Sequence, residues 1–195
     1  MPSIQHPRPQ THIAAASIHR DETDIKSFTK LAEGGFNRVF EITMKHDDAR
    51  VLARLPYPCI LPKRLTVASE VATLDFLRTQ GIPGPRVLEY STDAETNSVG
   101  AEYIIMEKAE GEPIGESWYT LSEKQRLKVL MGLVKIEEKL FAIDLKASGS
   151  IYYAHDLPPE MDRVAISCSP SQQGSDTTAA ARGEFCVGPV VSLKW

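Results

Sequence analysis

The chain has 195 residues, of which 42% are hydrophobic and 25% charged, and its formal net charge is −4 at pH 7. This composition is typical of a soluble globular protein, and the interleaved charges offer no basic surface for nucleic acid. No apolar run approaches the roughly 18 residues needed to span a bilayer. Three cysteines and five histidines without ligand spacing argue against a disulfide framework or a His/Cys metal site, and suit a reducing compartment.

Residues 1–22 form an N-terminal segment that we expect to be partly helical or disordered. Three prolines in the first nine residues predict a frayed start, and residues 11–19 look like the end of a helix leading into a sheet. Residues 1–20 contain no acid but include two arginines and three histidines, a faint version of a mitochondrial presequence. Composition alone favours the frayed segment over the presequence.

Residues 28–56 predict two strands joined by Gly34 and Gly35, then a third strand after a tight turn at 46–49. The second strand alternates with a period of two, which places two sets on opposite sides: Phe36, Arg38, Phe40, Ile42 and Met44, against Asn37, Val39, Glu41 and Thr43. Adjacent glycines can take positive φ and lack a Cβ, so their N–H groups could approach a phosphate. The alternative is an ordinary hairpin turn.

Arg54 lies on the short apolar strand 51–55, and residues 63–80 show helical spacing that ends at Gly81. The apolar stripe of this helix comprises Val67, Val71, Leu74 and Leu77, and Glu70 lies within it. A carboxylate on a buried helix face is costly without a cation, so we expect Arg54 to pair with Glu70. The alternative places Glu70 at the edge of the stripe, in water.

Two further strands, 86–91 and 101–108, complete the predicted fold class of residues 23–110: α+β, with an antiparallel sheet of about five strands and one helix.

Residues 111–166 begin a second, helical part. Ser122 and Gln125 form a capping-box pattern, and an apolar stripe runs to Asp144 opposite four lysines. Residues 150–155 predict a small strand. The side chains of residues 167–183 are small and polar, so they cannot bury enough apolar area to offset the entropy cost of ordering the chain. We therefore expect a disordered insertion before the last segment, 184–195.

Residues 31–40, Leu-Ala-Glu-Gly-Gly-Phe-Asn-Arg-Val-Phe, resemble the nucleotide loop of the aminoglycoside phosphotransferase and choline kinase superfamily, whose fold is protein-kinase-like. Within it the likeness is greatest to the fungal altered inheritance of mitochondria protein 9 family. Three further stretches carry this likeness: Arg-Leu-Pro-Tyr-Pro, Ala-Ser-Glu-Val-Ala-Thr-Leu-Asp-Phe-Leu-Arg and Phe-Cys-Val-Gly-Pro. The resemblance covers about residues 14–162 and resumes at 184–195.

The resemblance implies that the chain binds ATP with Mg2+ through a loop, an ion pair and a hinge: Gly34, Gly35, Phe36, Asn37, Val39, Arg54, Glu70, Met106, Glu107 and Ala109. In it, Met106 would flank the adenine, while backbone groups of Glu107 and Ala109 would bind its edge; plain core filling is the alternative for Met106. It also implies a small-molecule hydroxyl as phosphoryl acceptor, and a mitochondrial location in place of a cytoplasmic one. We expect Glu70→Ala to weaken nucleotide binding more than a change at an exposed Glu41.

Phosphoryl transfer also needs a base and metal-binding carboxylates. His155-Asp156 is the nearest match, but Met161 stands where the motif has Asn and two prolines intervene, so we reject it. By the resemblance, the catalytic and metal-binding Asp residues lie beyond Trp195. We therefore expect a truncated nucleotide-binding lobe that is inactive alone and leaves the helix at 122–144 exposed. The alternatives are a non-catalytic pseudokinase or interaction protein for mitochondrial inheritance, and a damaged product without a stable fold.

Overall fold

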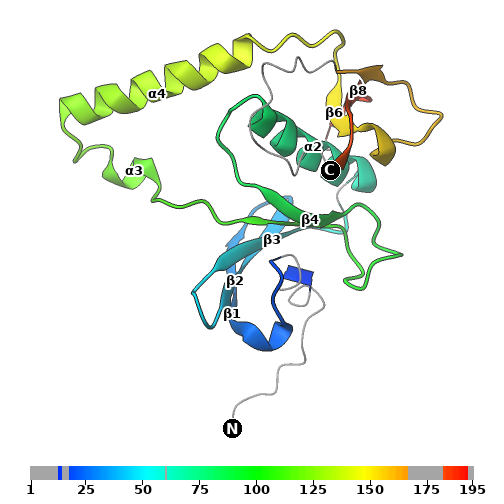
Figure 1. The fold of residues 1–195 in the computed structure, drawn as a ribbon, viewed down its shortest axis with the longest axis horizontal. Coiled ribbons are helices and arrows are strands. Elements are labelled where there is room, and N and C mark those ends of the chain that lie inside the picture. The colour runs from blue at the N-terminus through cyan, green and yellow to red at the C-terminus, as the bar shows by residue number, and fades with distance from the viewer. Residues whose placement is uncertain (1–12, 15–17, 60, 167–181, 193–195) are drawn as a thin grey trace.

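The computed structural model describes residues 13–14, 18–59, 61–166 and 182–192 (Figure 1). The helix end expected at 11–19 and the insertion expected at 167–183 therefore fall largely outside the described residues. Arg182 and Gly183, the last two residues of the range predicted as an insertion, are described, and Arg182 makes partly buried polar contacts.

A five-stranded antiparallel sheet forms the first part of the molecule, as the alternating sequence predicts. Its strands run in the order β1-β2-β3-β5-β4, after a short 3-10 turn, η1 (Glu22–Asp24). Their bounds are β1 Ile25–Glu33, β2 Asn37–Met44, β3 Arg50–Pro56, β4 Val87–Ser91 and β5 Tyr103–Glu107. All four pairings are antiparallel. The predicted fold class is confirmed.

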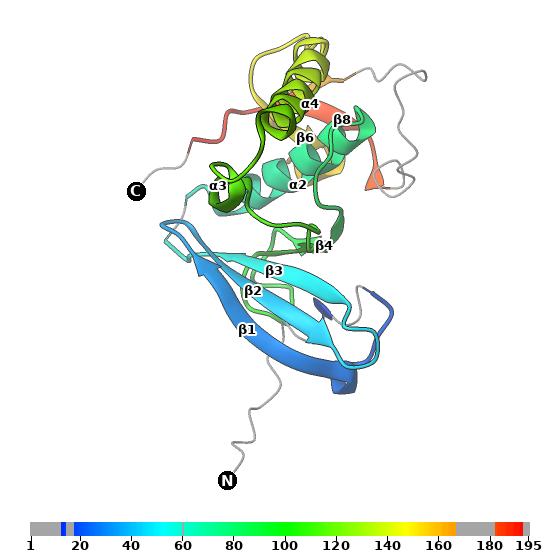
Figure 2. The ribbon, with the colours of Figure 1, turned by 90° about the vertical axis from the view of Figure 1, so that its left-hand side faces the viewer.

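The two faces of this sheet pack into separate cores. One face presents Ile42, Met44, Val51 and Ile105 to a cluster that includes Ala14 from the N-terminal segment. The other face packs on α2 (Lys63–Thr79), as Figure 2 shows, and shares a core of Val67, Val71, Phe76, Val87, Ile104 and Met106 with it. The alternation of residues in β2 thus sends its even-numbered apolar side chains away from α2.

Helix α2 begins after Pro62 and ends at Thr79, with Gln80 as its C-cap, and Gly81 follows at φ 68°, in the left-handed region that favours glycine. Its buried face is wider than the predicted stripe. Leu74 and Leu77 are only half-buried, whereas the buried residues are Val67, Ala68, Ser69, Val71, Ala72, Asp75, Phe76 and Thr79. The reason is that α2 is covered on two sides, by the large sheet and by a second, smaller one.

The smaller sheet joins three strands far apart in sequence: β6 (Ser150–Tyr153), β8 (Phe185–Gly188) and β7 (Val164–Ala165), in that order. A 3-10 turn, η2 (Ala154–Asp156), follows β6. Tyr152 and Cys186 pack against Ala68 of α2, so the small sheet covers a second side of this helix. The strand predicted at 150–155 is present over its first four residues, whereas its partner β8, and β7 on the far side of β8, were not predicted.

Helix α4 (Glu123–Phe141) follows the short α3 (Ile114–Ser117) and has the predicted capping box between Ser122 and Gln125. None of its residues is buried, and it extends away from both sheets (Figure 1). The exposure predicted for its apolar stripe is confirmed for Leu127, Leu130, Met131, Val134 and Phe141. Its last turn lies near the end of α2, where Lys139 Nζ donates to the Gly81 carbonyl at 2.6 Å. Across the described ranges, no helix has the length and apolarity to cross a membrane.

Two buried tyrosines, Tyr152 and Tyr153, and the half-buried Tyr90 make stability sensitive to alkaline pH. Burial raises the pKa of Tyr152 to about 12, and burial followed by a nearby carboxylate raises the pKa of Tyr90 and of Tyr153. Above pH ~10 the unfolded chain loses protons that these side chains keep when folded, so the free energy of unfolding falls as pH rises further. We expect Tyr153→Phe to flatten this decline in urea titrations between pH 9 and 12. Tyr119→Phe, at an 88% exposed tyrosine, should leave the slope unchanged; equal slopes in all three proteins would contradict the assignment.

Candidate functional site

The α2-facing surface of the sheet brings the predicted site residues of three strands together. Strand pairing aligns Val39 with Arg54 and Arg54 with Ile104, one residue from each of β2, β3 and β5. The next row on this face comprises Glu41, Leu52 and Met106. Helix α2 packs on this face, and its core includes Ile104 and Met106 from these two rows.

Arg54 and Glu70 form an ion pair across this space, as predicted. The pair joins β3 to α2, and both side chains are largely shielded from solvent, at 31% and 24% exposure. Burial lowers the pKa of the Arg54 guanidinium from its usual value, but an arginine remains charged in proteins. A fixed cation at this place can bind an anionic group that enters from the Gly34–Gly35 turn. That role in nucleotide binding stays a prediction.

The Gly34–Gly35 turn lies at the same end of the sheet, between β1 and β2. The Gly34 N–H donates to the Asn37 carbonyl at 3.0 Å, and Gly34 is not in the left-handed region. The positive φ that the sequence suggested is therefore not needed there, and the Gly34 amide is used within the turn. A Cβ added to Gly34 would meet nothing within 4 Å. The fold alone does not require glycine at position 34, whereas a close ligand would.

Tyr57, just after β3, links the Gly34–Gly35 turn to the end of β3 through three contacts. Its hydroxyl contacts the Glu33 carboxylate, its N–H donates to the Phe36 carbonyl at 2.9 Å, and the Arg38 guanidinium lies 5.3 Å from its ring centre. Asn37, the first residue of β2, faces Pro56. These contacts fix where the turn sits relative to Arg54, two residues before Pro56 along β3.

The predicted hinge begins in the last two residues of β5, Met106 and Glu107, and continues beyond the strand to Ala109. Met106 is 7% exposed and belongs to the core with α2, which is the core-filling arrangement that the sequence left open. Glu107 accepts from the Arg86 Nε at 2.9 Å, and its N–H donates to the Arg86 carbonyl at 2.9 Å. Ala109 is exposed. The contact of Met106 with a base, and the hydrogen bonds of Glu107 and Ala109 to it, stay predictions.

Glu41 is not the exposed residue that the sequence suggested. Its side chain is 15% exposed and forms an ion pair with Lys108, immediately after β5. The physical reason is register: Glu41 and Met106 flank Leu52 on the same face, so Lys108, two residues further along, reaches Glu41 across β3. Glu41 is therefore unsuitable as a neutral control.

A second polar cluster, which the sequence reading missed, lies between α2, β4 and the small sheet. Asp75, 2% exposed, accepts from the Tyr153 hydroxyl at 2.8 Å and from Arg182 Nη1 at 2.6 Å. Arg182 Nη2 donates to the carbonyls of Val87 and Leu88. Asp75, like Glu70, is an acid on the packed side of α2, four residues after Val71, and a carboxylate there is costly without a cation. That signal could have marked it as a buried acid in need of a cation.

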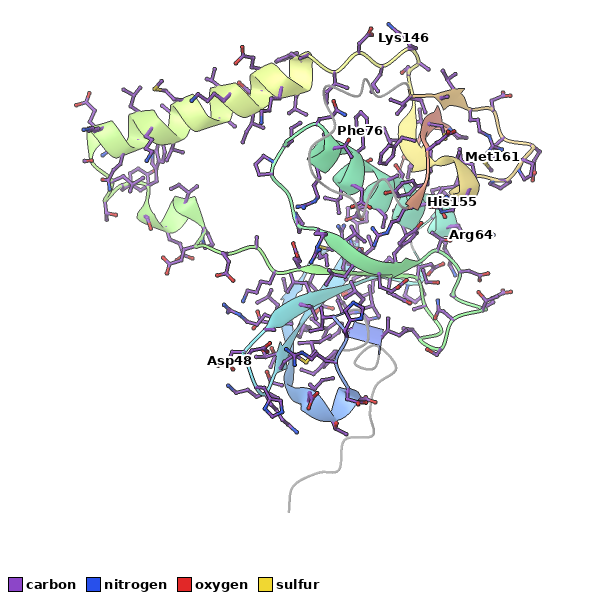
Figure 3. The ribbon with its side chains drawn as sticks, viewed as in Figure 1. Asp48, Arg64, Phe76, Lys146, His155 and Met161 are labelled. Carbon is purple, nitrogen blue, oxygen red and sulfur yellow. The ribbon has the colours of Figure 1, made fainter. Side chains whose placement is uncertain are left out.

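The rejected His155-Asp156 pair borders this cluster (Figure 3). The Tyr90 hydroxyl donates to Asp156 Oδ2 at 2.9 Å, and the His155 ring stacks on Tyr153. Asp156 thus ties β4 to the turn after β6. Among the described residues, no group of three or more His, Cys, Asp or Glu side chains could hold a metal ion.

Comparison with known proteins relates the chain to fungal proteins, while no family model matches it. A subtelomeric hrmA-associated cluster protein of Aspergillus fumigatus is 45% identical over 129 residues, 66% of this chain and 25% of that protein. The altered inheritance of mitochondria protein 9 of Clavispora lusitaniae is 31% identical over 150 residues, covering 72% and 24%. Its counterpart in Meyerozyma guilliermondii is 30% identical over 186 residues, covering 92% and 29%. The chain is homologous to these proteins and spans about a quarter of their length.

Proposed function

We propose that this chain is the nucleotide-binding part of a small-molecule kinase resembling the aminoglycoside phosphotransferases. In this proposal it binds ATP with Mg2+, and the full-length protein transfers the γ-phosphoryl group to a small-molecule hydroxyl. The observation that carries the proposal is the Arg54–Glu70 ion pair, which joins the third strand to the packed helix beside a glycine turn. A strand cation paired with a helix Glu is the arrangement that holds nucleotide phosphates in kinases.

Each part of the site has a definite task in this proposal. Arg54 neutralises phosphate oxygens, and Glu70 fixes the direction of its guanidinium. Gly34, Gly35, Phe36 and Asn37 cover the phosphates from above, with the missing Cβ of Gly34 leaving room for close approach. Val39 and Met106 border the base, and the backbone at 107–109 binds its edge. Mg2+ would accompany the nucleotide and help to neutralise its charge, but among the described residues no group of three or more His, Cys, Asp or Glu side chains fits a metal ion.

The central test measures ATP binding by isothermal titration calorimetry in the presence of Mg2+. We expect Arg54→Ala and Glu70→Ala each to weaken ATP binding by about tenfold or more, because a charge-assisted contact to phosphate is lost or misdirected. Glu137→Ala is the matched control, since it removes an exposed Glu from the interior of another helix, α4. A chain that does not bind ATP, or equal affinity in all four proteins, would disprove the proposal.

The relatives also suggest where the protein works. Several are named as mitochondrial proteins of altered mitochondrial inheritance, so we propose a mitochondrial location. Imaging of the tagged full-length protein against a mitochondrial marker tests this directly. A diffuse cytoplasmic signal would contradict it.

A further inference from the structure

Two consecutive residues, the last of β5 and the one after it, each form an ion pair with a different neighbouring strand region. Glu107 pairs with Arg86, which precedes β4, at 2.8 Å. The next residue, Lys108, pairs with Glu41 of β2 on the α2-facing side of the sheet. Consecutive residues of an extended chain point to opposite faces, so one pair lies on each face of the sheet. The chain at 107–108 is thereby fixed to both of its flanking regions.

The two pairs differ in their surroundings. Arg86 and Glu107 are about 40% exposed, and surface pairs of this kind contribute little. Lys108 and Glu41 are 27% and 15% exposed, and Glu41 lies in the same row as Leu52 and Met106. A carboxylate as shielded as that of Glu41 needs its cation. Separating the pair would release the Lys108 side chain from β2, and the backbone after Lys108 would then lose this anchor to the sheet.

We propose that Glu41 is a positioning residue, which acts through Lys108 to hold the backbone at 107–109 in place for the edge of a nucleotide base. This inference rests on the proposed function and deepens it, because it divides the site into two independent halves. Arg54 and Glu70 serve the phosphates. Glu41 and Lys108 serve the base, since they fix the segment after β5 and, within the described part of the chain, their charged side chains pair only with each other.

The test compares ATP with inorganic tripolyphosphate, which carries the phosphates without the base. We expect Glu41→Gln to weaken ATP binding about tenfold and to leave tripolyphosphate binding unchanged. Glu70→Ala should weaken both ligands. Asp48→Asn is the matched control, because it breaks an exposed ion pair with Lys26 at the outer turn between β2 and β3 (Figure 3). Asn also tolerates the positive φ of 50° found there.

Two further measurements keep the inference open to disproof if Glu41→Gln alone perturbs folding. The charge-swapped protein with Glu41→Lys and Lys108→Glu should recover most of the ATP affinity. Hydrogen exchange of the peptide covering 107–110, without ligand, should be faster in Glu41→Gln than in the parent and slow again in the swap. Loss of both ligands to the same extent in Glu41→Gln, or unchanged ATP affinity, would overturn the positioning role alone. Failure of the parent chain to bind either ligand would overturn the proposed function with it.

Discussion

Replacing Arg182 by Met is expected to lower the free energy of unfolding by about 3–5 kcal/mol, which is the usual cost of removing one partner from a buried ion pair. Asp75 is 2% exposed and would keep only the Tyr153 hydroxyl as partner. The carbonyls of Val87 and Leu88 would also each lose the hydrogen bond from Arg182. The measurement is the urea midpoint at constant slope, followed by circular dichroism.

The matched control is Lys146→Met, which removes the cation of a pair that is 72% exposed on both sides. This substitution should change the free energy of unfolding by less than about 0.5 kcal/mol. A double replacement, Asp75→Leu with Arg182→Met, should recover much of the loss, because it leaves no unpaired buried charge. A small effect of Arg182→Met alone would show that the cluster does not hold the small sheet to α2.

Local signals in the sequence predict the first three strands of the large sheet well, because these strands follow one another along the chain and apolar residues recur at alternate positions in β2. Pro62 and Gly81 delimit α2, and the cost of a buried carboxylate predicts the pairing of Glu70 with Arg54. These inferences rely on neighbours along the chain or on adjacent elements. They do not require knowledge of distant segments.

Long-range contacts account for what the sequence reading missed. Asp75 and Arg182 are 107 positions apart, and Arg182 ends a stretch of small and polar residues with no periodic pattern. Strand β8 pairs with both β6 and β7, so neither its register nor its cover over α2 follows from local propensity. The same cover explains why α2 buries a wider face than its apolar stripe indicates.

Phe76→Ala is expected to lower the free energy of unfolding by about 3–5 kcal/mol, the range for truncating a buried aromatic side chain. Phe76 is 2% exposed on α2 (Figure 3) and meets Phe185 of β8 edge to face, with ring centres 5.4 Å apart. Phe185 in turn stacks on Tyr153 of β6 at 4.8 Å. Loss of the Phe76 ring would thus leave a cavity where α2, β6 and β8 meet.

Phe141→Ala is the matched control, because it makes the same change in a helix at a side chain that is 89% exposed. We expect its free energy of unfolding to match that of the parent within about 0.5 kcal/mol. The comparison also tests the isolation of α4, since an aromatic residue packed against another surface would lose transfer energy on truncation. Equal, large losses for Phe76→Ala and Phe141→Ala would mean that α4 is covered in solution. A loss confined to Phe76→Ala would place the stability of the chain in the core around α2 and leave the apolar side of α4 uncovered.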